Sequence, residues 1–111
     1  MDIDFDKKSD RVVFNDAKLL VREFGAENAK RIMRRMIEFE IAYSLQDVPA
    51  TPPSRRHKLS NRKDEFAVDV KHPFRLVFTP DPDSPRGSDG AFDLSKVTGI
   101  VILRVEDYHG N

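Results

Sequence analysis

Residues that could cleave a phosphodiester stand at three separate points of the chain. They are His57, Arg75 and the group Asp107, Tyr108 and His109. A histidine titrates near neutral pH and can take or give a proton, and an arginine can hold two phosphate oxygens at once. Cleavage of RNA by its own 2′-hydroxyl needs a base, an acid and cations beside the phosphate. These residue types fit that reaction, although three histidines among 111 residues is an ordinary number.

Positive charge is concentrated in the middle of the chain. The formal net charge is zero, yet residues 54–79 hold 7 Lys and Arg against 3 Asp and Glu. A local basic patch is typical of a phosphate-binding surface, and equally often of a solvated one. Five residues of this segment are the candidates for RNA binding: Arg55, Arg56, Lys58, Arg62 and Lys63.

Two alternating apolar runs follow the basic segment. Residues 66–70 and 74–78 each place an apolar side chain at every second position, which predicts two strands with one buried face. The break at residues 71–73 is short enough for a hairpin turn, in which His72 is read as a turn residue. Arg75 is out of phase with its apolar neighbours, so we expect it on the face opposite the core.

Helical spacing occupies the first half of the chain. The pattern predicts one helix from Asp10 to Phe24 that ends at Gly25, and a second from Ala26 that the prolines at 49, 52 and 53 stop. Methionines at helical spacing are usually core residues rather than cofactor ligands. The second helix is expected to bury Ala29, Ile32, Met33, Met36, Ile37 and Tyr43. Its polar side is expected to carry Lys30, Arg31, Arg34, Arg35 and Glu38.

The remaining segments complete an α+β fold. Residues 2–5 alternate as an edge strand, residues 80–96 are a proline-rich acidic loop expected to be mobile, and residues 97–106 form an apolar central strand. We expect a single domain over residues 1–111, with a short N-terminal strand and a helix hairpin packed on a small twisted antiparallel sheet.

Composition narrows the class of protein. The chain has no cysteine, and the acidic N-terminal segment lacks the apolar stretch of a signal peptide. No apolar run is long enough to span a membrane. We therefore expect a cytoplasmic protein with no cofactor, no metal site and no membrane partner.

Three short sequence motifs can be compared with those of a known protein family. They are Arg56-His57-Lys58-Leu59, Phe74-Arg75-Leu76-Val77-Phe78 and Glu106-Asp107-Tyr108-His109. In this order and spacing the chain, from Phe14 onward, resembles the HigB-type killer proteins of the RelE/ParE toxin superfamily. The resemblance implies a fold like that of microbial ribonucleases and cleavage of mRNA on the ribosome, neutralised by a cognate helix-turn-helix antitoxin of the HigA type.

Carried over by residue, the resemblance assigns His57, Arg75, Asp107, Tyr108 and His109 to the active-site cleft. The chain departs from the family after the first motif, because Ser60 stands where a lysine is usual and two glycines are missing. Arg56, Lys58 or Arg62 could supply the lost phosphate contact.

Three functions remain open at this point. The first is a ribosome-dependent endoribonuclease toxin, which the whole set of residues favours. The second is a gyrase inhibitor like ParE, which shares the fold but needs no acid and base at the C-terminal end. The third is a catalytically silent interaction module, which the serine at position 60 favours. Fold alone does not separate toxins of one superfamily.

Overall fold

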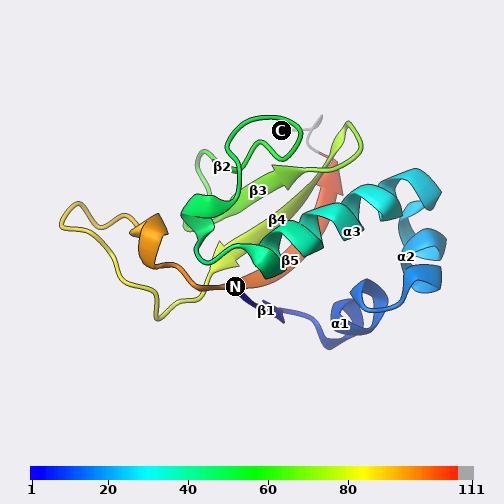
Figure 1. Ribbon diagram of the computed structural model, residues 1–111, viewed down its shortest axis with the longest axis horizontal. Helices are drawn as coiled ribbons and strands as arrows, with labels where there is room; N and C mark the ends of the chain where they lie inside the picture. The colour runs from blue at the N-terminus through cyan, green and yellow to red at the C-terminus, as the bar shows by residue number, and fades with distance from the viewer. Residues whose placement is uncertain (108–111) are drawn as a thin grey trace.

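The computed structural model describes residues 1–107, which form a five-stranded sheet with helices on one face (Figure 1). The α+β class is therefore confirmed. The strands are β1 (Asp2–Phe5), β2 (His57–Lys58), β3 (Phe66–Asp69), β4 (Phe74–Pro80) and β5 (Gly99–Asp107), in the order β1-β5-β4-β3-β2. The helices are α1 (Lys8–Phe14), α2 (Ala17–Phe24) and α3 (Ala26–Ile41), with short 3-10 turns η1 (Leu45–Asp47) and η2 (Leu94–Lys96).

The sheet is mixed, whereas the sequence pattern predicted an antiparallel one. Strand β1 pairs in parallel with β5, from Asp2 opposite Gly99 to Phe5 opposite Ile102, and the other pairs are antiparallel. A parallel pair needs a long connection between its strands, and here almost the whole chain lies between them. Strand β1 does lie at the sheet edge, as predicted.

The predicted helix from Asp10 to Phe24 is divided in two. Asp16 takes an extended conformation between α1 and α2, and its Oδ1 accepts hydrogen bonds from the backbone N–H groups of Lys18 (2.9 Å) and Leu19 (3.2 Å). Aspartate is a preferred N-cap because it satisfies these otherwise unpaired donors. The pattern predicted helix correctly over most of this range, but it did not reveal the capping signal at Asp16.

Helix α3 begins where predicted and ends earlier. It stops at Ile41, eight residues before Pro49, and the chain continues into η1, whose Ser44 and Asp47 form a capping box. None of the helices within residues 1–107 has the length and apolarity needed to cross a membrane.

The predicted buried stripe of α3 is partly wrong. Ala29 and Ile32 are fully buried as expected, but Ile37 and Tyr43 are exposed and Phe39 is buried instead. Arg35, which was placed on the polar side, is only 4% exposed. Its Nε donates to the carbonyl oxygen of Asp69 at 2.8 Å and its Nη1 binds Glu38, so the buried guanidinium is satisfied.

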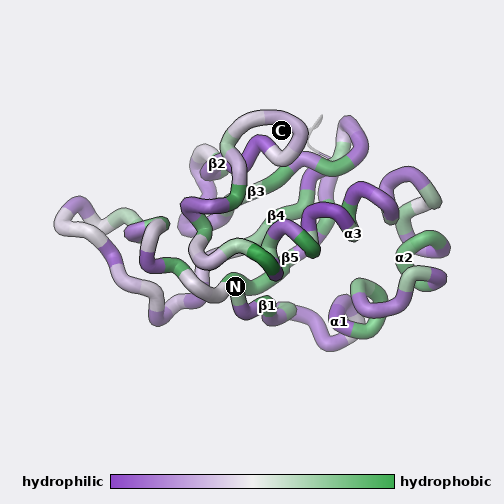
Figure 2. The backbone as a smooth tube through the Cα atoms, viewed as in Figure 1, coloured by the Kyte–Doolittle hydropathy of each residue, from purple (hydrophilic) through white to green (hydrophobic). Residues whose placement is uncertain are grey.

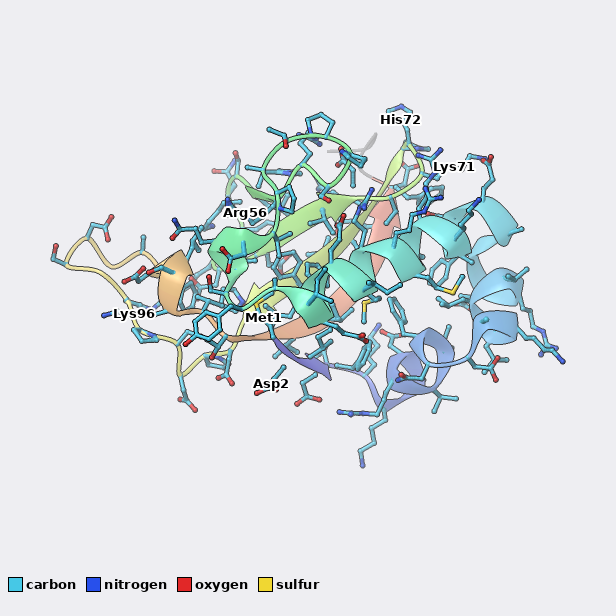
Figure 3. The ribbon with its side chains drawn as sticks, in the orientation of Figure 1. Met1, Asp2, Arg56, Lys71, His72 and Lys96 are labelled. Atoms are coloured by element: carbon cyan, nitrogen blue, oxygen red, sulfur yellow. The ribbon has the colours of Figure 1, made fainter. Side chains whose placement is uncertain are left out.

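The hairpin of β3 and β4 is confirmed. Phe66 faces Phe78 and Asp69 faces Arg75, so Arg75 lies on the opposite face of β4 from Leu76. At the turn, the backbone N–H of Lys71 donates to Oδ1 of Asn28 at 3.2 Å, which ties the hairpin to α3. Figure 3 shows the labelled Lys71 and His72 at this turn.

The two faces of the sheet carry different side chains. The large core lies on the helix side, where Leu76, Phe78, Ile100 and Ile102 pack with residues of α2 and α3 such as Phe39. The other face has a small cluster of Leu59, Ala67 and Val77, with Leu103 packed against it. Figure 2 shows apolar residues in the middle of the sheet and mostly polar residues along the projecting segment 80–96.

Residues 80–96 have internal structure, although they extend away from the sheet in Figure 1. Arg86 and Phe92 form an isolated antiparallel bridge, with the Arg86 guanidinium 3.9 Å from the ring centroid. Arg86 Nη2 also binds Asp64 Oδ2 at 2.9 Å, which links this segment to the loop before β3. Its mobility stays a prediction.

Candidate functional site

A cleft of about 500 Å³ opens beside the helix-free face of the sheet. Strands β2 and β4 and the loop after β2 surround it, and the two residues most central to the predicted chemistry, His57 and Arg75, both line it. The described residues that line this cleft are His57, Lys58, Leu59, Ser60, Asn61, Arg62 and Arg75.

His57 is oriented by the backbone just before it. Its Nδ1 lies 2.7 Å from the carbonyl oxygen of Arg55, and a carbonyl oxygen only accepts, so Nδ1 carries the proton. Nε2 is then the ring nitrogen that can accept a proton from a substrate. The register of β2 pairs His57 with Ala67, which places it on the same face of the sheet as Arg75.

Arg75 is nearly buried and bound to a carboxylate. Its side chain is 11% exposed, and its Nη2 and Nε donate to Glu106 Oε2 at 2.7 Å and 3.1 Å. Strands β4 and β5 place the two residues directly opposite each other. The neighbouring strand therefore holds the guanidinium at the cleft.

Glu106 is the centre of a larger ionic cluster. Arg62 Nη1 donates to its two oxygens at 2.7 Å and 3.0 Å, and Arg104 Nε donates to Oε1 at 3.0 Å. Burial raises the pKa of Glu106, but the hydrogen bonds from the three arginines outweigh it and lower the pKa to about 2. The carboxylate is therefore ionised at neutral pH. Glu65 adds a second carboxylate, bound to Arg104 and 3.5 Å from Arg62 Nη1.

The five predicted RNA-binding residues do not act as one group. Lys58 and Arg62 line the cleft, whereas Arg55, Arg56 and Lys63 are not among the residues that line it. Arg55 binds Asp69 through two hydrogen bonds of 2.7 Å and 3.0 Å. Burial lowers the pKa of Arg56, whose buried Nε has no hydrogen-bond partner within residues 1–107.

The C-terminal part of the predicted site is only partly described. Asp107 is opposite Phe74 in the register, so strand alternation directs its side chain away from the face of Arg75 and Glu106. The predicted grouping of Asp107 with Arg75 is therefore not what the register favours. Tyr108 and His109 lie outside the described residues, so their predicted approach to the cleft remains a prediction.

Glu65, Arg104 and Glu106 were not among the residues that the sequence predicted for this site. A signal was present, because Arg104 and Glu106 are two apart in a strand and hence on one face. Charged side chains at alternate positions of an otherwise apolar strand need partners. Pairing with β4 identifies Arg75 as one partner, and only the tertiary structure shows that Arg62 and Glu65, from the segment between β2 and β3, also join the cluster.

Comparison of the chain with family models, with curated proteins and with solved structures finds no match. The resemblance to HigB-type toxins therefore stays a prediction carried by the three motifs. Within residues 1–107, no three His, Asp or Glu side chains are placed to hold a metal ion. The chemistry of the cleft is that of an imidazole, an ammonium group and guanidinium groups around a space of about 500 Å³.

Proposed function

We propose that the protein is an endoribonuclease of the toxin type, which cleaves mRNA on the ribosome. The observation that supports the proposal most is that His57 and Arg75, which are 18 positions apart in sequence, line one cleft on the helix-free face. An imidazole can take the proton of an attacking 2′-hydroxyl, and a guanidinium can stabilise the charge that builds on the phosphate. The order of the three sequence motifs is the second support.

In the proposed reaction the RNA supplies its own nucleophile. Nε2 of His57 takes the proton of the 2′-hydroxyl, the 2′-oxygen bonds to phosphorus, and the bond from phosphorus to the 5′-oxygen breaks. Arg75 and Arg62 stabilise the charge on the non-bridging oxygens. The resemblance assigns protonation of the leaving 5′-oxygen to Tyr108 or His109. The products are a 2′,3′-cyclic phosphate and a 5′-hydroxyl.

The proposed partners are the ribosome with its mRNA and a helix-turn-helix antitoxin of the HigA type, which implies action in the cytoplasm. A formal net charge of zero gives little general attraction for a free polyanion. Orientation of a flexible strand is itself a large part of catalysis, and the ribosome would supply it. A reading frame for a small helix-turn-helix protein beside the gene would support this pairing.

Substitution in the cleft tests the proposal. Arg75→Ala and His57→Gln should each lower cleavage of mRNA on programmed ribosomes by about 100-fold or more, as loss of a charge stabiliser or a base does. Arg31→Ala, which removes an exposed guanidinium from α3, is the matched control and should leave cleavage unchanged. Circular dichroism should show all three variants folded. Full activity of Arg75→Ala would refute the assignment.

The substrate context is tested separately. Purified protein should cleave naked mRNA far more slowly than mRNA under translation, and the fragments should end in cyclic phosphate. Equal rates on the two substrates would make it an ordinary small ribonuclease without ribosome dependence.

A catalytically silent interaction module is the second candidate, because one observation favours it. Arg62, Arg75 and Arg104 all bind carboxylates of the same cluster, so part of their charge is neutralised before any ligand arrives. Wild-type protein that binds ribosomes or antitoxin but gives no fragments on any programmed ribosome would select this candidate.

A further inference from the structure

Glu106 accepts hydrogen bonds from three arginines that come from three separate segments. Arg62 belongs to the loop after β2, Arg75 to β4 and Arg104 to β5. The Glu106 side chain is only 15% exposed, and the four donor-acceptor distances from Nη and Nε atoms of Arg62 and Arg75 lie between 2.7 Å and 3.1 Å. A single carboxylate thus sits where three guanidinium groups meet.

Counting charges shows what this arrangement leaves for a ligand. The cluster holds three guanidinium groups and two carboxylates, Glu65 and Glu106, and so keeps a formal charge of one positive unit. Arg62 and Arg75 both line the cleft, so a phosphate entering it meets donors that already serve a carboxylate. Charge-assisted hydrogen bonds to a carboxylate and to a phosphate use the same fork geometry of arginine.

We propose that Glu106 is an internal counter-anion that weakens the affinity of this cleft for an isolated phosphate. A phosphate must share or displace the hydrogen bonds that Glu106 receives, so stable binding requires further contacts on both sides of that phosphate. The cleft therefore selects a chain of nucleotides over inorganic phosphate or a mononucleotide. The identity of the ligand as RNA rests on the proposed function. The test with inorganic phosphate does not depend on it.

Neutralising Glu106 without changing its shape should tighten phosphate binding. Glu106→Gln retains an oxygen that accepts hydrogen bonds from the arginines and removes the negative charge beside the ligand. A unit charge about 5 Å away in a partly open site alters affinity by about tenfold at an effective dielectric constant of about 50. If Glu106 instead acts only to position the arginines, the same variant should bind phosphate equally or less well.

Calorimetric titration with inorganic phosphate at pH 7 and low salt distinguishes these outcomes. We expect Glu106→Gln to bind phosphate about tenfold more tightly than the wild type. In the wild type the Glu65 carboxylate pairs with Arg62 and Arg104, so we expect Glu65→Gln to bind phosphate about threefold more tightly. Glu23→Gln, on the exposed surface of α2, is the control and should change nothing. Unchanged or weaker binding by Glu106→Gln overturns the inference.

Two further measurements keep the test decisive. If Glu106→Gln does not fold, the Glu65→Gln titration decides the question, and no gain there overturns the inference. A 2′-deoxytrinucleotide, which cannot be cleaved, should bind the wild type more tightly than inorganic phosphate does. Its affinity should increase less than that of phosphate when Glu106 is replaced by glutamine. If Glu106→Gln binds phosphate more tightly but no form of the protein cleaves RNA, the inference stands and the proposed nuclease is refuted. If the protein cleaves RNA but Glu106→Gln does not bind phosphate more tightly, the nuclease stands and the inference is overturned.

Discussion

The two faces of the sheet are organised by different forces. Among residues 1–107, the helix side holds sixteen buried core residues, whereas the other face holds three buried apolar residues and an ionic cluster around Glu106. Arg75 and Leu76 are neighbours in β4 and yet belong one to each environment. One face is stabilised by apolar burial, and the other is arranged by charge.

This difference indicates how the molecule separates stability from ligand binding. Apolar burial stabilises the fold without requiring particular bond directions, and a close-packed core tolerates changes of side-chain volume poorly. The helix face is therefore the main source of stability. Replacing a whole buried ion pair by apolar groups often costs little stability, but removing one partner destabilises the fold, and the pairing fixes the position of the donors. Changes on the helix face should therefore alter unfolding, and changes on the cleft face should alter binding, cleavage and pH dependence.

The largest expected effect is on the helix face. Leu76→Ala should lower the free energy of unfolding by about 3 to 4 kcal/mol, because Leu76 is 0% exposed within the main core and its loss leaves a cavity. Val77→Ala, at the next residue on the opposite face, should cost about 1 to 2 kcal/mol. Urea denaturation measures both. A loss for Val77→Ala as large as the loss for Leu76→Ala would show that the cleft face has a core of comparable importance.

The second effect is the pH dependence that Glu106 introduces. Its pKa is lowered from the ordinary 4.5 to about 2, so the folded state binds this proton less readily than the unfolded state. The associated stability is present above pH 4.5 and is lost as the pH falls toward 2. Each tenfold change in proton affinity corresponds to about 1.4 kcal/mol. With allowance for solvent screening, we expect the free energy of unfolding to fall by about 2 kcal/mol over this pH range.

Comparison of wild type with Glu106→Gln isolates this contribution. The variant should be less stable than the wild type at pH 7, and the gap should close as the pH falls from 4.5 to 2. Glu23→Gln should run parallel to the wild type throughout. A constant gap between wild type and Glu106→Gln would mean that the carboxylate has no lowered pKa.

A smaller effect is expected at the junction of α2 and α3. Gly25 has φ 85° and ψ 159°, a conformation essentially restricted to glycine, and a Cβ there would meet no atom within 4 Å. Gly25→Ala should therefore cost about 1 to 2 kcal/mol from backbone strain alone. Gly99→Ala, where a Cβ would make only ordinary contacts of 3.7 Å, should stay within about 0.5 kcal/mol. Thermal unfolding that ranks the two variants the other way would contradict this account.

The smallest effect on cleavage is expected in the loop. Replacing residues 83–91 by a short turn removes Arg86 and its ion pair with Asp64, but keeps Phe92 and Leu94, which pack on the core. Ribosome-stimulated cleavage should stay within about tenfold, or 1.4 kcal/mol in barrier, while antitoxin affinity changes. Arg86→Ala alone separates the ion pair from the loop length. Loss of cleavage with antitoxin binding intact would show that the loop serves the chemistry.

Much of the fold could be predicted because its signals are local. The alternation in residues 66–70 and 74–78 predicted both the hairpin and the face of Arg75, and residues 2–5 were placed at the sheet edge. Some of the errors have local causes too, whereas the parallel pairing of β1 with β5 joins the two ends of the described chain. Asp16 caps a helix inside a continuous apolar pattern, and the spacing of α3 did not distinguish exposed Ile37 from buried Phe39. Periodicity identifies an apolar stripe on a helix, but it does not tell which residues at the edge of the stripe are buried.

The sequence alone determined which residue types are available to a site: a histidine in a basic segment, an arginine out of phase in a strand, and no cysteine. Only the tertiary structure decided that Arg62 and Arg75 share Glu106, from which they are separated by 44 and 31 positions. The physical reason is that a carboxylate can bind any arginine that reaches it. Strand register, set by packing on the opposite face, determines which ones do.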